Sequence, residues 1–204
     1  MKQHQKYEYV SSASLPTRWG QFTIHGFVEI DTQQEHVALS YGEWQTGDVV
    51  PIRIHSECLT GDALFSTRCD CGAQLEKAFS NIVEQGKGIL LYLRQEGRGI
   101  GLLNKIRAYH LQDKGMDTVE ANEHLGFDAD LREYGICKLM LDKLNVQRVT
   151  LMTNNPKKRL ALEALGIDVV SRTPIDHGVT DANRKYIRTK TEKLGHEFDP
   201  HLFK

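Results

Sequence analysis

The stretch that decides the fold is residues 88–114, which read GILLYLRQEGRGIGLLNKIRAYHLQDK. Residues 88–93 are a short, continuous apolar run, which predicts a buried strand. A glycine-rich loop over 95–101 leads from this strand into a helix predicted over 102–114, and Gly115 is placed to end that helix. A buried strand joined to a helix in this way favours a sheet that is covered by helices.

The rest of the chain divides into a first third of strands and a later part in which strands and helices alternate. Short apolar or alternating runs predict strands over 22–30, 36–41, 49–55, 149–153 and 167–171. Helical patterns cover 72–85, 131–144, 156–165 and 181–194. We therefore expect an α/β fold in which a mixed β-sheet is flanked by helices in three layers, with one domain over residues 1–204.

The charge balance and the ends of the chain limit the classes of partner. The 204 residues include 26 Lys and Arg and 27 Asp and Glu, so the formal net charge is −1. A nucleic-acid or membrane-surface binder is normally basic, and we expect neither partner here. The N-terminus has no apolar export signal, and no apolar run approaches the ~20 residues that span a bilayer. We therefore expect a cytoplasmic protein whose thiols stay reduced.

Three of the four cysteines lie close together in the sequence, at Cys58, Cys69 and Cys71. Thiolates are preferred soft ligands of zinc, and the short turn between Cys69 and Cys71 suits two sulfurs on one ion. Three protein ligands leave a fourth position for water, which is typical of catalytic zinc. The fourth cysteine, Cys137, lies in an apolar helical pattern and is expected in the core.

Two other interpretations of the cysteine cluster remain open. The three thiols could be small buried hydrophobes, although Glu57, Arg68 and Asp70 are poor neighbours for a core. Alternatively, His55 could complete a closed structural site of one histidine and three cysteines.

Two strand-to-helix junctions carry residues that suit phosphate groups. The loop with Gly97, Gly99 and Gly101 fits neither the dinucleotide fingerprint nor Walker A. Residues 153–158, TNNPKK, place a hydroxyl, two amides and two cations at a helix start. Turn geometry or an Asn cap explains either junction alone. Together with a three-thiolate zinc, the two junctions predict a phosphorylated substrate beside the metal.

The acid–base candidates are Asp130, Arg132, Tyr109 and the glycine-loop pair Glu96 and Arg98. Each of the first three also has a simpler role. Asp130 suits the N-cap of the helix predicted over 131–144, Arg132 a solvated first turn, and Tyr109 core packing. Spacing alone does not choose between these roles.

Taken together, these segments closely resemble GTP cyclohydrolase II, the enzyme that opens riboflavin biosynthesis. The matching segments are HSECLTGD (55–62), RCDCG (68–72), RQEGRGIGLLNK (94–105), DTVEAN (117–122), LGF (125–127) and TNNPK (153–157). The resemblance runs from about residue 10 to residue 196 and includes TK at 189–190 and KLGH at 193–196. The length leads us to expect the monofunctional form, without a fused dihydroxybutanone-phosphate synthase domain.

The resemblance implies a role for each matched position. Zinc would be held by Cys58, Cys69 and Cys71. GTP would be held by Arg53, Ile54, His55, Ser56, Glu57, Gln74, Glu96, Gly97, Arg98, Thr118, Thr153 and Lys158. The family also implies Mg²⁺ on the triphosphate and a homodimer.

The implied reaction hydrolyses GTP to 2,5-diamino-6-hydroxy-4-(5-phosphoribosylamino)pyrimidine, formate and pyrophosphate. Asp130 would be the proton acceptor, Arg132 the nucleophile, and Tyr109 an aid to the ring chemistry. A guanidinium with a pKa above ~12 is a poor nucleophile, so the alternative role for Arg132 is to stabilise charge on the phosphorus.

Three other functions compete with this one. A family relative could open the ring without releasing pyrophosphate, and a non-enzymatic zinc module would need a basic face and a closed site. A zinc nucleoside deaminase needs a Pro-Cys-x-x-Cys motif, which this sequence lacks.

Overall fold

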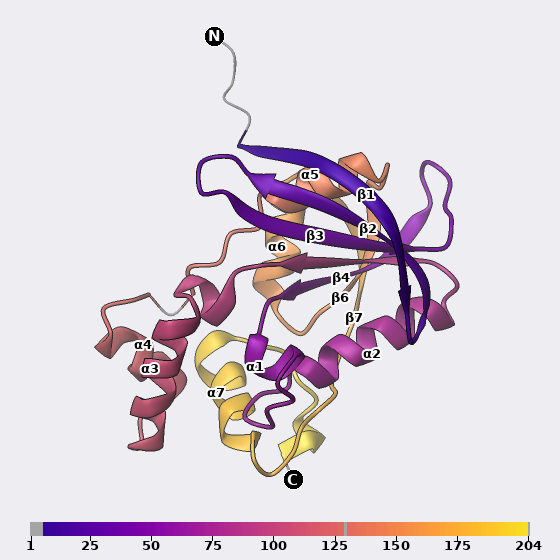
Figure 1. Ribbon diagram of the computed structural model, residues 1–204. Coiled ribbons are helices and arrows are strands. Elements are labelled where there is room, and N and C mark those ends of the chain that lie inside the picture. The colour runs from indigo at the N-terminus through magenta and orange to yellow at the C-terminus, as the bar shows by residue number, and fades with distance from the viewer. Residues whose placement is uncertain (1–5, 129, 204) are drawn as a thin grey trace.

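A seven-stranded mixed sheet forms the centre of the computed structural model, which describes residues 6–128 and 130–203 (Figure 1). Its strands are β1 (Tyr7–Thr17), β2 (Gly20–Glu29), β3 (Gln34–Tyr41), β4 (Val49–Ser56), β5 (Gly88–Leu93), β6 (Arg148–Met152) and β7 (Asp168–Thr173). The strand order is β1-β2-β3-β5-β4-β6-β7. Strands β1 to β3 form an antiparallel meander that pairs antiparallel with β5, whereas β4 to β7 run parallel. The predicted mixed α/β sheet is confirmed.

Helices cover the two faces of this sheet, as the three-layer prediction requires. On one face, α2 (Cys71–Glu84) packs Ala78, Phe79 and Ile82 against Phe22 and Leu90. On the other face, α5 (Ile136–Lys143) and α6 (Pro156–Ala164) pack against side chains of the central strands. Because side chains alternate along a strand, Ile52 and Ile54 of β4 face this second layer. Cys137 is fully buried there, as predicted.

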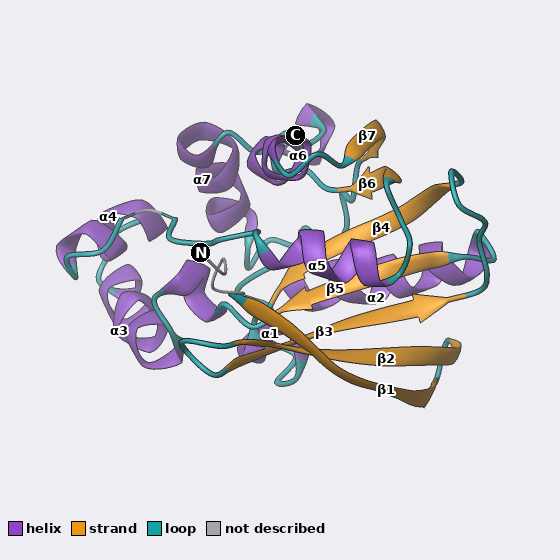
Figure 2. Cartoon of the chain, turned by 90° about the horizontal axis from the view of Figure 1, so that it is seen from above, coloured by secondary structure: helices purple, strands orange, loops and turns teal. Residues whose placement is uncertain are grey.

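The remaining helices gather beyond the carboxyl ends of the central strands. They are α1 (Leu59–Asp62), the 3₁₀ turn η1 (Glu96–Gly99), α3 (Leu102–Asp113), α4 (Thr118–His124), α7 (Arg184–Leu194) and the 3₁₀ turn η2 (Pro200–Phe203). Helices α3 and α4 lie side by side away from the sheet, and α7 contacts α4 (Figure 2). None of the described helices is both long enough and apolar enough to cross a bilayer.

The structure corrects the helix predicted over 131–144, which begins only at Ile136. Asp130 is therefore not its N-cap, a position that Gly135 occupies. Residues 130–134 instead form a non-helical segment tied to the glycine loop, because the Leu131 N–H donates to the Arg98 carbonyl at 3.0 Å. This contact places Asp130 and Arg132 beside the loop after β5.

Besides the short helix α1 and the two 3₁₀ turns, two described elements were not predicted, strand β1 and helix α4. Strand β1 lies at the edge of the sheet, and most of its side chains are exposed, so it lacks the apolar alternation that marks a half-buried strand. Helix α4 is short, but the sequence did contain its start signal. Asp117 and Glu120 form a capping box in which each side chain accepts from the other residue's backbone N–H.

Candidate active site

The carboxyl ends of β4, β5 and β6 open into one cavity, at the edge where open α/β sheets bind ligands. It encloses about 970 Å³, part of which is open to solvent, and this size suits a small molecule. Its walls come from the segments after these three strands and from α3, α4 and α7. The predicted site residues on its lining are Arg53, His55, Ser56, Glu57, Cys58, Cys69, Cys71, Gln74, Glu96, Gly97, Arg98, Tyr109, Thr118, Arg132, Thr153 and Lys158.

Two predicted site residues do not line the cavity. Ile54 points away from it into the core, and only its carbonyl faces the site, where it accepts a hydrogen bond from Lys158 Nζ at 2.8 Å. Alternation along β4 explains this, because the neighbouring Arg53 and His55 take the cavity side. Asp130 is not on the lining, but it binds Arg132, which is.

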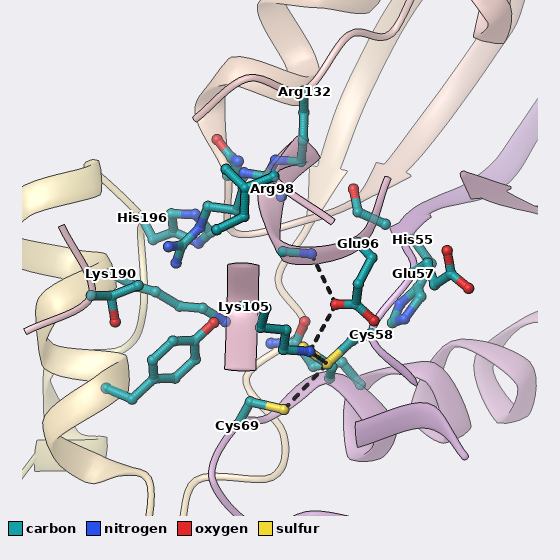
Figure 3. Close-up of a pocket in the computed structure, with 18 of the residues that line it drawn as sticks. His55, Glu57, Cys58, Cys69, Glu96, Arg98, Lys105, Arg132, Lys190 and His196 are labelled. Carbon is teal, nitrogen blue, oxygen red and sulfur yellow. Dashed lines mark hydrogen bonds and ion pairs between the residues drawn. The ribbon is translucent and has the colours of Figure 1, made fainter. Parts of the chain in front are cut away.

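The three cysteines converge on the lining of the cavity. Figure 3 shows two of them, Cys58 and Cys69, close together at one end. The three sulfur atoms all lie within 4.8 Å of one another, and the Cys58 and Cys69 sulfurs are 3.6 Å apart. Zinc–sulfur bonds of about 2.3 Å in a tetrahedron place sulfurs roughly 3.8 Å apart. Gly61 makes the approach possible, since a Cβ there would lie 2.9 Å from the Cys69 sulfur. The residues present therefore fit a zinc ion.

An ion pair between Lys105 and Glu96 of the glycine loop supports the thiol cluster. Lys105 Nζ donates to Cys58 Sγ at 3.1 Å, to Glu96 Oε1 at 2.8 Å and to Thr60 Oγ1 at 3.0 Å. Burial opposes the charge on Lys105, but Cys58 and Glu96 outweigh it and raise the pKa of Lys105. Hydrogen bonds from Cys69 and Cys71, and then this ammonium, lower the pKa of Cys58. The surroundings therefore favour a thiolate at Cys58, the form that binds metal.

His55 does not join the metal ligands. Its Nε2 lies 2.9 Å from Asp62 Oδ1, and its ring stacks on Tyr92 with 5.4 Å between centroids. The other oxygen of Asp62 accepts from the Cys58 N–H at 3.0 Å and from the Tyr92 hydroxyl at 2.8 Å. In the described part of the chain, the three cysteines are the only group of three or more potential metal ligands that lie this close together. Asp62 thus ties His55 to the backbone of a cysteine, and the closed histidine–cysteine site is not formed.

Asp130 and Arg132 form a bidentate pair at the opposite side of the cavity. Arg132 Nε donates to Oδ1 and Nη2 to Oδ2 of Asp130, each at 2.7 Å. Burial would raise the pKa of Asp130, but the bonds from Arg132 outweigh it, and that pKa is lowered. Burial likewise opposes the charge on Arg132, yet Asp130 raises its pKa. Both groups are therefore held in their charged forms.

Three further cations face the cavity without an ion-pair partner among the described residues. Arg53 donates to the Met152 carbonyl at 2.9 Å and to Gln74 Oε1 at 2.8 Å, and burial lowers its pKa to about 10. Lys158 donates only to a carbonyl, and burial lowers its pKa well below the usual value. Arg98 has a buried Nη2 without a hydrogen bond. Uncompensated buried cations indicate an anionic ligand.

No chemical role was predicted for Asp70 or for the C-terminal residues that line this cavity. Asp70 lies between two of the cysteines, is fully buried, and accepts from Lys190 Nζ and from Gln74 Nε2 at 2.6 Å. Tyr186 and His196 join Lys190 on the lining. The family-like segments at 189–190 and 193–196 were a signal for two of these residues, but they indicated no chemistry.

Comparison with known proteins agrees with this geometry. The sequence model of the GTP cyclohydrolase II family matches residues 8–174. A GTP cyclohydrolase-2 of Shewanella denitrificans is 58% identical over 96% of this chain and 95% of its own length. A GTP cyclohydrolase-2 of Hahella chejuensis is 60% identical over 95% of this chain and 93% of its own length. A riboflavin biosynthesis protein of Vibrio vulnificus is 56% identical over 100% of this chain, which spans 56% of that protein.

Among solved structures, the two-domain 3,4-dihydroxy-2-butanone 4-phosphate synthase RibBX of A. baumannii is similar to this chain with a TM-score of 0.43. The two are 17% identical, and the similarity covers 74% of this chain and 35% of the other. The family match and the near full-length relatives lead to one conclusion: this chain belongs to the GTP cyclohydrolase II family.

Proposed function

We propose that the protein is a zinc-dependent GTP cyclohydrolase II. It hydrolyses GTP to 2,5-diamino-6-hydroxy-4-(5-phosphoribosylamino)pyrimidine, formate and pyrophosphate. One observation carries the proposal: a single cavity has a three-thiol cluster at one end and cations without carboxylate partners at the other. This arrangement suits a ligand with a hydrolysable ring at one end and a phosphate chain at the other. Family membership supports the same substrate.

The cysteine end of the cavity serves ring opening. Cys58, Cys69 and Cys71 hold zinc, which supplies Lewis-acid activation of water at neutral pH. Lys105 and Glu96 fix the position and charge of the Cys58 sulfur. Burial raises the pKa of Tyr109, so its phenol stays protonated and is able to donate a hydrogen bond to the purine ring during the reaction.

The cationic end binds the triphosphate and serves pyrophosphate release. Arg98 and Lys158 neutralise phosphate oxygens, and Arg53 lies between the two ends, since the charge of Cys71 acts on it and its own charge acts on Lys158. Mg²⁺ accompanies the triphosphate. Arg132 is oriented by Asp130 and stays protonated in that pair. A protonated guanidinium has no lone pair to offer, so this geometry supports charge stabilisation at the α-phosphorus over nucleophilic attack by Arg132.

The proposal includes a homodimer in the cytoplasm, built from one domain per chain. The family resemblance is the basis for the homodimer. The cytoplasm is supported by the thiol cluster, because three reduced cysteines persist most readily in a reducing compartment.

A product assay tests this function. Purified protein is incubated with GTP, Mg²⁺ and Zn²⁺, and formate and pyrophosphate are quantified from the same samples. We expect equal amounts of both products and loss of formate after chelation. Formate without pyrophosphate would indicate the ring-opening relative, and absence of both products would contradict the proposed reaction.

A further inference from the structure

One wall of the cavity comes from a segment beyond the match to the family model, which ends at residue 174. Helix α7 places Tyr186 and Lys190 on the lining, four residues apart and hence on one face of the helix. Gly195, in the left-handed conformation, ends the helix, and His196 follows it into the cavity. The C-terminal segment is therefore part of the site.

This wall is held in place at several points. Besides the ion pair of Lys190 with Asp70, Lys193 Nζ binds Glu120 Oε1 on α4 at 3.1 Å. After the helix, the Glu197 N–H donates to the Asn154 carbonyl at 2.8 Å. These contacts connect the segment to the cysteine turn, to α4 and to the loop after β6. The backbone of His196 is thus fixed relative to three other walls of the cavity.

The His196 ring faces a group of cations (Figure 3). It stacks nearly parallel on Phe198, with 6.0 Å between centroids, which fixes its orientation. Neither ring nitrogen is hydrogen-bonded to any residue in the described ranges. The charges that act on the ring are those of Lys190, Arg132, Lys158 and Arg98.

Those surroundings keep the imidazole neutral. Burial first, and then the four cations, lower the pKa of His196 to about 2. A neutral imidazole carries one N–H donor, and no described protein group accepts from it. A buried nitrogen of Arg98 also lacks an acceptor. His196 is only partly buried and its ring lines the cavity, so oxygen atoms of an anion bound there would accept from the imidazole N–H as well as from the buried Arg98 nitrogen.

We propose that His196 is a substrate-binding residue that donates a hydrogen bond to a phosphate oxygen of the nucleoside triphosphate. This inference rests on the proposed function, which supplies the triphosphate. It assigns the loop after α7 to phosphate recognition, beside Arg98 and Lys158. It also gives the C-terminal segment a role in substrate affinity in addition to its contacts with the other walls.

Binding measurements on the full-length, zinc-loaded protein test this inference with two probes. Inorganic tripolyphosphate reports on the phosphate end alone, and guanosine reports on the rest of the site. For His196→Ala we expect tripolyphosphate to bind about 10-fold more weakly, as for loss of one hydrogen bond to a charged group. Guanosine affinity, zinc content and melting temperature should stay unchanged. His196→Gln, which keeps an N–H donor, should recover most of the loss.

His201→Ala is the matched control, because His201 is an exposed histidine of the same C-terminal segment. It should bind both probes as the wild type does. Tripolyphosphate affinity of His196→Ala within twofold of the wild type would overturn the inference, as would equal losses for both probes. Failure of the wild-type protein to bind tripolyphosphate would also overturn it. A wild type that binds tripolyphosphate but releases neither formate nor pyrophosphate from GTP would contradict the proposed function alone.

Discussion

Strands β5 and β6 flank β4 in the sheet, and the loops that follow these two strands hold their conformations in different ways. After β5, the chain turns through left-handed residues, including Arg98 with φ 63°, before α3 begins. After β6, Asn155 caps α6 through the Lys157 N–H at 3.0 Å, and Pro156 begins the helix. The first loop depends on backbone freedom and the second on side-chain hydrogen bonds.

The difference corresponds to what each loop contributes to the cavity. The loop after β5 supplies Glu96, which with Lys105 supports the cysteine end. The loop after β6 contributes Thr153 and Asn154 to the lining, and the helix that follows supplies Lys158 to the cationic end. The junction after β5 thus supports the cysteine end through Glu96 and contributes Arg98 to the cationic end, whereas the junction after β6 serves the cationic end. Variants at the two ends should therefore affect formate and pyrophosphate differently.

The largest effect is expected at the cationic end. Arg132→Ala should slow pyrophosphate release by about 10³-fold, because it removes charge stabilisation at the transferring phosphorus. It also leaves Asp130 without its partner, so Arg132→Ala combined with Asp130→Asn controls for that buried charge. Single-turnover measurements of both products check the prediction. Unchanged pyrophosphate release in the double variant would remove Arg132 from the mechanism.

A smaller effect is expected at the cysteine end. Glu96→Gln keeps the side-chain shape but removes the charge that holds Lys105, so formate release should fall about 10- to 100-fold. Pyrophosphate release should change less. Glu123→Gln, at an exposed carboxylate on α4, is the control and should match the wild type. Equal losses of the two products in Glu96→Gln would argue against separate ends.

The smallest effect concerns the loop that connects the ends. Gly99 has a φ of 95°, and a Cβ there would lie 3.0 Å from Leu131 Cβ. Gly99→Ala should lower the free energy of unfolding by about 1–3 kcal/mol and slow pyrophosphate release, since Leu131 neighbours Arg132.

The matched control is Gly115→Ala, which has a φ of 110° but no atom within 4 Å of the new Cβ. It shares the backbone strain without the contact. Denaturant unfolding of both variants checks this prediction. If Gly115→Ala lowers the free energy of unfolding as much as Gly99→Ala does, the contact with Leu131 contributes nothing to the destabilisation.

Much of the sheet could be predicted from the sequence, because its central strands are short apolar runs between clear turn residues. The run over 88–93 and the helix start at Pro156 are found where the pattern placed them. The edge strand β1 is mostly polar, and its stability comes from pairing with β2 along 7–17, which composition does not reveal. The non-helical residues 130–134 before α5 are held to the glycine loop by the bond from Leu131 to Arg98, a long-range contact that no local pattern shows.

The site was predicted less evenly. The spacing of the three cysteines predicted their cluster, because Cys69 and Cys71 lie on one short turn. No local signal gave Asp70 its partner Lys190, since 120 positions separate them. His196 lies in a polar segment without periodic features, and only the folded chain places it beside Arg98.

The most direct test of whether the cavity has two separate functional ends uses Cys69→Ser. Formate and pyrophosphate are measured in one reaction with GTP and Mg²⁺, and zinc content and melting temperature are measured on the same protein. We expect loss of zinc and of formate, a retained fold, and continued release of pyrophosphate with GMP as its co-product. Loss of formate and pyrophosphate together in a protein that stays folded would contradict this expectation.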